Sequence, residues 1–528
     1  MLLHDLVLAS AETRPSNPAL IKGDNVLYYE ELGSELANTG EGLACIGVLP
    51  GDRVAVYLNK RVEAVLAYFG VSYAGAIFVP INPILKPAQV RHILIDCDVK
   101  VLVTTAALAA SLRDVLCDCD RLDNLVIVDN QAVDSATPKR LESISWAELI
   151  NIQSVTPRPA RRIDTDVAAI LYTSGSTGKP KGVVLSHRNM VAGALSVASY
   201  IENEPNDVIL AVLPFSFDAG FSQMTTAFSS GASVVLIDYL FPTDIPKMAA
   251  KYAATGLTGV PPLWNQLSRL EWPKEAMESL RYIANTGGAM PTATLTSLRK
   301  RLPRTKVFLM YGLTESFRST YLPPEEIDNR PTSIGKVIPN AEVLVVNDDG
   351  NICGPGEPGE LVHRGALVSL GYWNDKEKTA ERFRPAPCQA DGLPLREIAV
   401  WSGDTVVTDE EGFLFFVGRK DDMIKSSGYR ISPTEVEEVI YATRLVNECA
   451  AIGLPHRDLG QAVVIVCQTD NPNDAIQDAL INACKENLPN YMVPADVLMI
   501  DALPRNPNGK IDRKALSAEY AQLFSDPD

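Results

Sequence analysis

The sequence predicts an α/β protein: a large N-terminal domain of α/β subdomains plus a small antiparallel β unit, followed by a small α+β C-terminal domain. Short β-rich runs alternate with helical stretches as far as about residue 320, which is typical of sheets covered by helices. From about residue 333 helical periodicity fades and turn signals multiply. Another pattern of helices and strands follows Gly418, and 528 residues exceed one ordinary domain.

The first part is expected to hold buried strands, because its β-rich runs are almost continuously apolar. The longest uncharged stretch, residues 64–81, raises the question of a membrane span. It contains Gly70 and Ser72 and meets Pro80, so a buried helix that turns into a strand is the better interpretation. The expected strands are 52–58, 77–81, 99–105, 124–130, 207–214, 233–238 and 306–312.

The last part of the chain carries its own helix and strand signals. Residues 333–365 contain Asp-Gly, Pro-Gly and Gly-Pro turns, which predict the antiparallel β unit. Ser432-Pro433-Thr434-Glu435 is a helix start with a capping box, and a strand, a helix and a strand are expected over 462–469, 473–488 and 497–500. We place the boundary at Asp421, which gives domains 1–420 and 421–528.

Composition and charge narrow the classes of function. Hydrophobic residues are 46% and charged residues 21%, which is typical of a globular chain. The net charge of −17 repels polyanions, so we expect neither nucleic acid nor a membrane as a partner. The nine cysteines are scattered along the chain, which indicates free thiols rather than a disulfide framework. The N-terminal residues lack a signal-peptide pattern. A cytoplasmic location is expected.

The segment LYTSGSTGKPKG, residues 171–182, has the composition of a phosphate-binding loop. Its glycines and hydroxyl residues supply backbone amides and hydroxyl groups, and Lys179 and Lys181 supply positive charge. It is not a Walker A loop, because Gly175 and Gly178 are only two residues apart and no GK[ST] follows. Both flanks read as strands, so the loop is expected to close a hairpin. An ordinary turn with two solvated lysines is the alternative.

This loop resembles the signature loop of the adenylate-forming ligases, which include acyl-CoA synthetases, adenylation domains of peptide synthetases and luciferases. Further segments resemble the family's other motifs in the same order, so the resemblance covers essentially the whole chain. They are YGLTE at 311–315, SGD at 402–404, GRKDDMIKSSGYRISPTEVE at 418–437 and NPNGKIDRK at 506–514.

The resemblance implies a two-step reaction. A carboxylate first attacks the α-phosphorus of ATP to give an acyl adenylate and pyrophosphate, and the acyl group then passes to a phosphopantetheine thiol. It also implies that Tyr311 stacks on adenine, Asp404 holds the ribose and Glu315 helps to hold Mg²⁺. Thr173, Glu315 and Lys510 are the catalytic candidates. The ATP-binding candidates are Thr173, Ser174, Gly175, Ser176, Thr177, Gly178, Lys179, Lys181, Gly287, Gly288, Ala289, Tyr311, Gly312, Thr314, Asp404, Arg419 and Lys510.

Each of these residues also has an ordinary structural interpretation. Tyr311 could be a core aromatic residue, Asp404 a turn residue and Lys510 a solvated loop lysine. In the family, the lysine at the position of Lys510 spans the carboxylate and the phosphates during adenylation. The small domain is then mobile about a hinge at Asp421, and its swing brings residues 427–429 beside a pantetheine tunnel.

The segment LPFSFDAGF, residues 213–221, bears on which acid is the substrate. Asp218 resembles the aspartate of amino-acid adenylation domains that pairs with a substrate ammonium group, although Gly220 replaces the usual serine. A carboxylate among phenylalanines needs a cation or amide donors, whereas an N-cap role is the alternative. Family alignment suggests these substrate-binding positions: Phe217, Asp218, Gly259, Ala284, Thr286, Met310, Arg318 and Ser319.

The role of Arg318, and with it the identity of the substrate, is left open by the sequence. Arg318 could reach a second substrate carboxylate or neutralise Glu315 or Asp218. We expect a small amino or imino acid such as L-proline, loaded onto a separate carrier protein. Part of the chain also resembles acyl-CoA ligases found with exosortase systems, so a CoA ligase for a small acid is the alternative. A non-catalytic scaffold is disfavoured because Glu315, Asp404 and Lys510 are all present.

Overall fold

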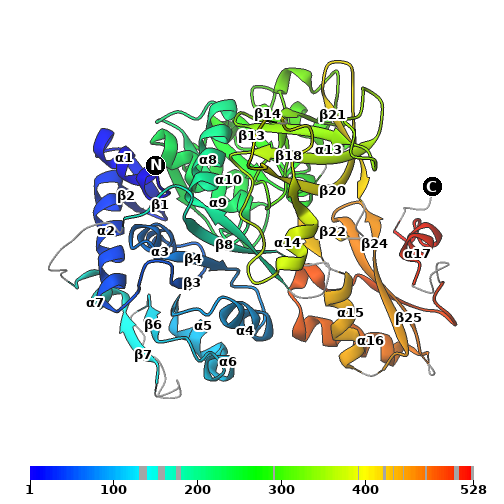
Figure 1. Ribbon diagram of the computed structural model, residues 1–528, viewed down its shortest axis with the longest axis horizontal. Helices are drawn as coiled ribbons and strands as arrows, with labels where there is room; N and C mark the ends of the chain where they lie inside the picture. The colour runs from blue at the N-terminus through cyan, green and yellow to red at the C-terminus, as the bar shows by residue number, and fades with distance from the viewer. Residues whose placement is uncertain are drawn as a thin grey trace.

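The computed structural model describes residues 1–129, 140–152, 161–173, 180–288, 290, 292–390, 392–419, 424–431, 433–443, 445–469, 472–504 and 511–524. Figure 1 shows a large body, coloured blue to yellow, with a smaller orange and red body beside it. Within the described residues, no helix is both long enough and apolar enough to cross a bilayer.

A seven-stranded sheet forms one side of the large body, in the order β7-β6-β5-β3-β4-β8-β9. Its neighbours pair in parallel except β8 and β9, which form an antiparallel hairpin. Residues 64–81 are a buried helix and strand, as expected. The strands are β3 (Arg53–Tyr57), β4 (Ile77–Ile81), β5 (Val101–Thr104), β6 (Asn124–Ile127), β7 (Glu142–Ser145), β8 (Val167–Thr173) and β9 (Lys181–Ser186).

A 14-stranded sheet runs through the rest of the large body, in the order β17-β18-β20-β21-β16-β15-β14-β13-β12-β10-β11-β1-β2, with β19 beside β20. Its strands are β1 (Pro18–Lys22), β2 (Asn25–Tyr28), β10 (Val208–Ala211), β11 (Ser233–Leu236), β12 (Gly256–Gly259), β13 (Tyr282–Asn285), β14 (Lys306–Tyr311), β15 (Thr320–Leu322), β16 (Ser333–Val337), β17 (Ala341–Val346), β18 (Gly359–Gly365), β19 (Phe383–Pro385), β20 (Ile398–Thr408) and β21 (Leu414–Arg419).

The predicted antiparallel unit is confirmed, but it is not a separate sheet. Strands β16 to β21 pair antiparallel, and β15 joins them to the parallel strands. The turn signals revealed the hairpins, whereas the continuous pairing depends on β14 and β15, which the sequence pattern alone could not align. Tyr311 therefore lies at the end of a strand in the middle of the sheet.

The small body is built on a five-stranded sheet, in the order β23-β22-β25-β24 with β26 beside β25. Helix α15 begins at Pro433, as the capping signal predicts. Sheet membership changes between Arg419 and Ile424, and the predicted hinge Asp421 falls there, outside the described residues. The elements are β22 (Ile424–Ser426), β23 (Tyr429–Ile431), α15 (Pro433–Ala442), β24 (Glu448–His456), β25 (Gly460–Gln468), α16 (Asp474–Asn487), β26 (Asp496–Met499) and α17 (Arg513–Glu519).

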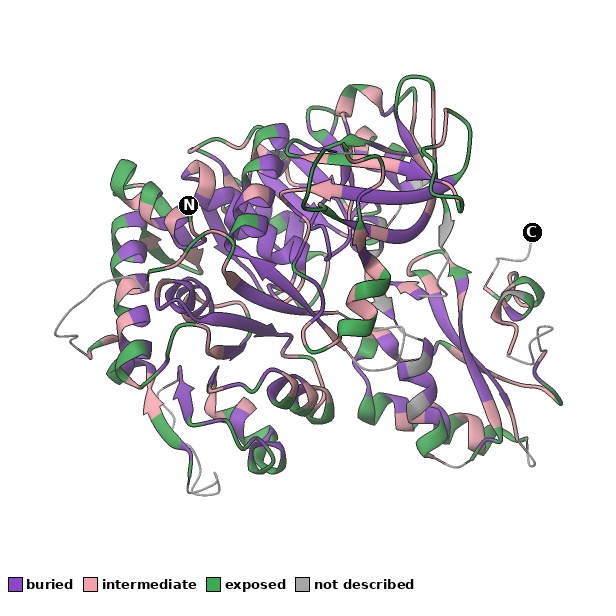
Figure 2. Ribbon diagram, in the orientation of Figure 1, coloured by how far each residue is buried: buried purple, intermediate pink, exposed green. Residues whose placement is uncertain are grey.

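Helices α3 and α9 lie in the centre of the large body, where Figure 2 shows mostly buried residues. Phe221 of α9 stacks on Phe78 of β4, with ring centroids 5.1 Å apart, so one core joins the two sheets. This packing fixes the N-terminal turn of α9. The large body's helices are α1 (Asp5–Thr13), α2 (Tyr29–Cys45), α3 (Val62–Tyr73), α4 (Pro87–Asp96), α5 (Ala106–Ser111), α6 (Arg113–Cys117), α7 (Trp146–Ile150), α8 (His187–Ile201), α9 (Asp218–Ser230), α10 (Asp244–Lys251), α11 (Pro261–Leu267), α12 (Lys274–Ser279), α13 (Thr292–Arg301) and α14 (Lys376–Arg382).

Candidate functional site

The predicted phosphate loop is held between two paired strands. Thr173 ends β8 and lies in register with Lys181, which begins β9, so the expected hairpin flanks are present. The loop between them, with Ser174, Gly175, Ser176, Thr177, Gly178 and Lys179, lies outside the described residues. The position of both loop ends is nevertheless fixed by the ladder of backbone hydrogen bonds.

Lys181 places a half-buried cation at the base of this loop. Its ammonium lies 5.5 Å from the ring centroid of Tyr372. Burial, reinforced by the charge of Lys378, lowers the pKa of Lys181 from its usual value, while the carboxylate of Glu315 acts in the opposite direction. A partly desolvated cation beside a carboxylate gains from a phosphate anion that approaches the same point.

Glu315 lies close to that cation, in the turn that follows β14. The Tyr372 hydroxyl donates a hydrogen bond to Glu315 Oε1 at 2.6 Å. Glu315 Oε2 is buried and has no hydrogen-bond partner among the described residues. Such an oxygen fits a divalent cation, and one carboxylate suits Mg²⁺, which keeps water and phosphate oxygens as its other ligands.

Tyr372 was missed by the sequence reasoning. It lies in an extended segment whose backbone pairs with β9: Trp373 N donates to Gly182 O at 2.7 Å and Val184 N donates to Gly371 O at 2.9 Å. The tandem aromatic residues Tyr372 and Trp373 after a glycine were the available signal. Their partners lie almost 200 residues earlier, so only the folded chain reveals the contact.

Tyr311 and Asp404, the residues predicted to hold adenine and ribose, contact each other. The Tyr311 hydroxyl donates to Asp404 Oδ2 at 2.6 Å, and Asp404 is fully buried. Asp404 of β20 is the register partner of Arg419 in β21, whose side chain lies outside the described part of the structure. A Cβ atom on Gly312 would lie 2.8 Å from Phe317 O, so glycine is needed for this turn to close.

The small body touches the large one beside the glycines at 287 and 288. Gly287 has φ +77°, and a Cβ atom there would lie 3.2 Å from Gly428 O and 3.4 Å from Val260 Cγ1. The turn between β22 and β23 therefore covers this edge of the site. Ala289, Asp421 and Lys510 lie outside the described residues, so their predicted roles remain predictions.

Asp218 forms a buried ion pair with Arg318. Asp218 Oδ2 accepts a hydrogen bond from Arg318 Nη1 at 3.2 Å, and the two residues are 5% and 2% exposed. Asp218 is the first residue of α9, and the N-cap is Phe217, so the N-cap alternative is wrong. Among the partners considered for Arg318, the described structure selects Asp218.

The other predicted substrate positions lie on the strands nearby. Ala284 of β13 is in register with Thr258 of β12, and Thr286 N donates to Gly259 O at 3.1 Å. Met310 and Ser319 are buried. Ser319 Oγ lies 3.0 Å from His363 Nδ1, which the sequence reasoning missed, and burial lowers the pKa of His363 to about 3, so its ring is neutral.

Gly220, which replaces the family's usual serine, is required by the turn before α9. A Cβ atom at this position would lie only 1.8 Å from Pro214 O, a carbonyl that also accepts from Phe217 N at 3.2 Å. The departure from the family pattern is therefore matched to the local backbone.

We expect Gly220→Ala to lower the free energy of unfolding by about 1–3 kcal/mol, because the helix start must shift to relieve the overlap. Gly392→Ala is a matched control, since a Cβ atom there meets nothing within 4 Å. Urea unfolding of both variants checks this. Equal stability of the Gly220 and Gly392 variants would contradict the close approach of residue 220 to the Pro214 carbonyl oxygen.

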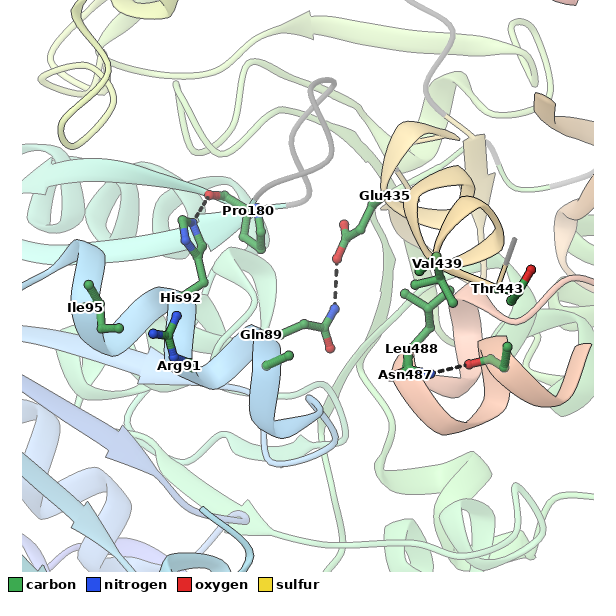
Figure 3. A pocket seen from close by; sticks show the side chains of 13 residues that line it. Gln89, Arg91, His92, Ile95, Pro180, Glu435, Val439, Thr443, Asn487 and Leu488 are labelled. Atoms are coloured by element: carbon green, nitrogen blue, oxygen red, sulfur yellow. Dashed lines mark hydrogen bonds between the residues drawn. The ribbon is translucent and has the colours of Figure 1, made fainter. Parts of the chain in front are cut away.

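A pocket of about 560 Å³ lies between the two bodies, as Figure 3 shows. Gln89 of α4 donates through Nε2 to Glu435 Oε1 of α15 at 2.8 Å, and this hydrogen bond spans the interface. His92 Nε2 lies 3.1 Å from Pro180 O, beside Lys181. The interface thus reaches the end of the phosphate loop.

Comparison with known proteins identifies the family. A profile described as AMP-binding enzyme matches residues 7–373, and one described as AMP-binding enzyme C-terminal domain matches residues 435–510. The chain belongs to the AMP-binding enzyme family. Members of this family use ATP, and the chain is an AMP-forming ligase with the fold of adenylate-forming enzymes.

Curated relatives of this AMP-binding enzyme come from two groups. It is 31% identical to a long-chain-fatty-acid–CoA ligase of Escherichia coli O157:H7, over 98% of this chain and 94% of that protein. It is 30% identical to tyrocidine synthase 3 of Brevibacillus parabrevis, over 97% of this chain but only 8% of that protein.

Two solved structures extend the comparison. A double mutant of the o-succinylbenzoate CoA synthetase MenE from Bacillus subtilis, bound with its product analogue OSB-NCoA, superposes with a TM-score of 0.82 at 26% identity, over 99% of this chain and 98% of that chain. ATP-bound MatB from Rhodopseudomonas palustris superposes with a TM-score of 0.69 at 25% identity, over 99% of this chain and 100% of that chain.

Proposed function

We propose that this enzyme activates a small amino or imino acid, such as L-proline, and loads it onto the phosphopantetheine thiol of a separate carrier protein. The observation that carries the proposal is the carboxylate of Asp218, which is buried beside the predicted acid site. Asp218 Oδ2 accepts a hydrogen bond from Arg318 Nη1, and we propose that a substrate ammonium group approaches the same carboxylate, which attracts cations and accepts hydrogen bonds only.

The same contact argues for a small acid. The ion pair and the side chain of Met310 occupy the interior next to α9, and both partners of the pair are almost fully buried. A long alkyl tail that entered here would have to separate the pair at a cost of several kcal/mol, about 3–5 kcal/mol if one partner lost its counter-charge. The buried pair therefore favours a small acid over the long-chain fatty acid in the name of the E. coli relative.

Adenylation follows from the charges around the loop. A carboxylate oxygen bonds to the α-phosphorus of ATP, the bond to the β-phosphate oxygen breaks, and pyrophosphate leaves. Lys181 and Lys510 would offset the negative charge that gathers on the phosphates, and Glu315 Oε2 would help to hold Mg²⁺. When bound, that ion supplies Lewis-acid stabilisation of the phosphate oxygens.

We propose that the described arrangement of the small body serves the second step, in which the thiol attacks the acyl carbon and AMP leaves. Gly428 lies against Gly287 and Val260 in this arrangement. The higher TM-score to the enzyme that holds a CoA product analogue than to the ATP-bound enzyme, at similar identity, supports this interpretation. A hinge at Asp421 would bring Lys510 to the site for adenylation.

A CoA ligase that acts on a small acid is the second candidate. The E. coli CoA ligase matches this chain along nearly all of both sequences, which favours free CoA as the acceptor. Purified enzyme would be offered CoA and a phosphopantetheinylated carrier protein in parallel. Thioester formed with the carrier protein alone supports loading in trans. Thioester formed with CoA alone supports the second candidate, a CoA ligase.

We expect ATP–pyrophosphate exchange to depend on amino or imino acids, in a panel that also contains fatty and aryl acids. Asp218→Asn should slow exchange with the preferred amino acid about 10- to 100-fold more than exchange with an amine-free acid of similar size, because one charge-assisted hydrogen bond is lost. Asp244→Asn, at the start of helix α10, is the control for the loss of one negative charge. Exchange confined to amine-free acids would contradict the proposal.

A further inference from the structure

A small cavity lies beside Arg318, between the helices α8 and α9 and the sheet. Its volume is about 10 Å³, which holds one water-sized group. The lining residues come from α8, α9 and four neighbouring strands together with Arg318. They are Val197, Ile201, Ile209, Ala219, Ser222, Gln223, Thr226, Thr258, Tyr282, Met310 and Arg318.

Two polar atoms of these lining residues are buried without a partner. Arg318 Nε and Gln223 Oε1 make no hydrogen bond to any described residue, and the two residues are 2% and 3% exposed. Gln223 Nε2 donates to Gly220 O at 3.1 Å, which leaves Oε1 as the free end of the amide. A buried donor and a buried acceptor that line one small cavity are costly unless a third group satisfies both.

The chemistry of that third group is narrowly defined. It must accept a hydrogen bond from Arg318 Nε and donate one to Gln223 Oε1, which a hydroxyl group does with a single oxygen atom. A methyl group would leave both atoms unsatisfied. A carboxylate or an ammonium group would add an unbalanced charge beside an ion pair that is already neutral. A carboxamide exceeds the available volume.

The cavity adjoins the predicted acid site through shared residues. Met310 and Arg318 line it and are also predicted substrate positions. Thr258 lines it and is in register with Ala284. Tyr282, Ala284 and Thr286 alternate along one chain segment, so their side chains share a face of the sheet. A small acid held at Asp218 would therefore direct its far end toward this cavity.

We propose that Arg318 Nε and Gln223 Oε1 bind a hydroxyl group of the acid substrate, so that the enzyme prefers a hydroxylated small acid to its methyl or deoxy counterpart. Gln223 is then a specificity-determining residue, and Arg318 both neutralises Asp218 and binds the hydroxyl group of the substrate. This inference rests on the proposed function and deepens it by naming the group at the substrate's far end.

The test uses matched pairs: threonine and valine, serine and 2-aminobutyrate, 4-hydroxyproline and proline. ATP–pyrophosphate exchange should favour the hydroxylated member of at least one pair by about 10- to 100-fold, because an unmade buried hydrogen bond costs that much in affinity. Calorimetry with the sulfamoyl-adenosine analogues of the preferred pair should show the same ratio in dissociation constants. Gln223→Met should reduce the ratio to near one, whereas Gln266→Met, at an exposed glutamine, should preserve it.

The outcomes separate the two proposals. If the methyl or deoxy member is used or bound equally well or better, and Gln223→Met changes the melting temperature but not the ratio, the cavity holds a structural water and the inference is overturned while the proposed function stands. If no amino or imino acid supports exchange or binds as its analogue, the proposed function fails and the inference fails with it.

Discussion

Replacing Gly428 with alanine is expected to slow transfer of the acyl group to the thiol about 100-fold while adenylate formation stays near the wild-type rate. The new Cβ atom would lie 2.7 Å from Val260 Cβ and Cγ1, across the interface between the small and large bodies. Under the proposed hinge motion these residues separate for adenylation, so the substitution should disfavour only the arrangement proposed for acyl transfer. Single-turnover measurements of adenylate and thioester formation check the two steps separately.

Gly460→Ala is the matched control for this prediction. Gly460 and Gly428 have φ values of +78° and +79°, so alanine is equally strained in the backbone at both positions. A Cβ atom on Gly460 is no closer than 3.5 Å to its neighbours, whereas the one on Gly428 overlaps Val260. Equal losses in both half-reactions, or an equal loss of thioester formation in the control, would show that the interface does not serve acyl transfer.

Replacing Arg318 with methionine is expected to lower the free energy of unfolding by about 3–5 kcal/mol, because it leaves the buried carboxylate of Asp218 without its arginine partner. The pair lies in the interior, where water cannot solvate the remaining charge. Chemical denaturation of the wild type and the variant, fitted with one shared m-value, measures the loss in the free energy of unfolding.

The double variant Asp218→Leu with Arg318→Met separates the charge effect from lost packing. Removing both partners deletes the unpaired charge, so most of the lost stability should return, while exchange with amino acids should stay impaired. A single Arg318→Met variant as stable as the wild type would contradict the buried pair. A double variant no more stable than the single one would attribute the loss to packing instead.

Local signals were enough for most of the fold. The hairpin around the phosphate loop follows from two apolar runs that flank a Gly- and Ser-rich turn, and α15 follows from the capping signal at 432–435. The antiparallel unit was predicted, but its continuation into the parallel sheet was not, because strand pairing across β14 and β15 depends on tertiary contacts.

The site was predictable in its residue types and not in its partnerships. Tyr311, Glu315 and Asp404 were proposed from motifs. Asp218 was one of several partners considered for Arg318, but the two residues are 100 positions apart, and no local pattern could choose among the partners. The contact of Tyr372 with Glu315 and the unsatisfied atoms of the cavity behind α9 likewise exist only in the packed chain. Gly220 shows the same limit, since its need for glycine comes from the carbonyl of Pro214.

The most direct test follows the oxygen of the carboxylate. The enzyme would be mixed with ATP, Mg²⁺ and amino acids whose carboxylates carry a heavy oxygen isotope, and after acyl transfer the nucleotide product would be analysed by mass spectrometry. If the group around Lys181 and Glu315 joins a carboxylate to the α-phosphorus, AMP appears with one heavy oxygen, and Glu315→Gln strongly reduces it. Release of ADP, or of AMP without the label, would contradict the account.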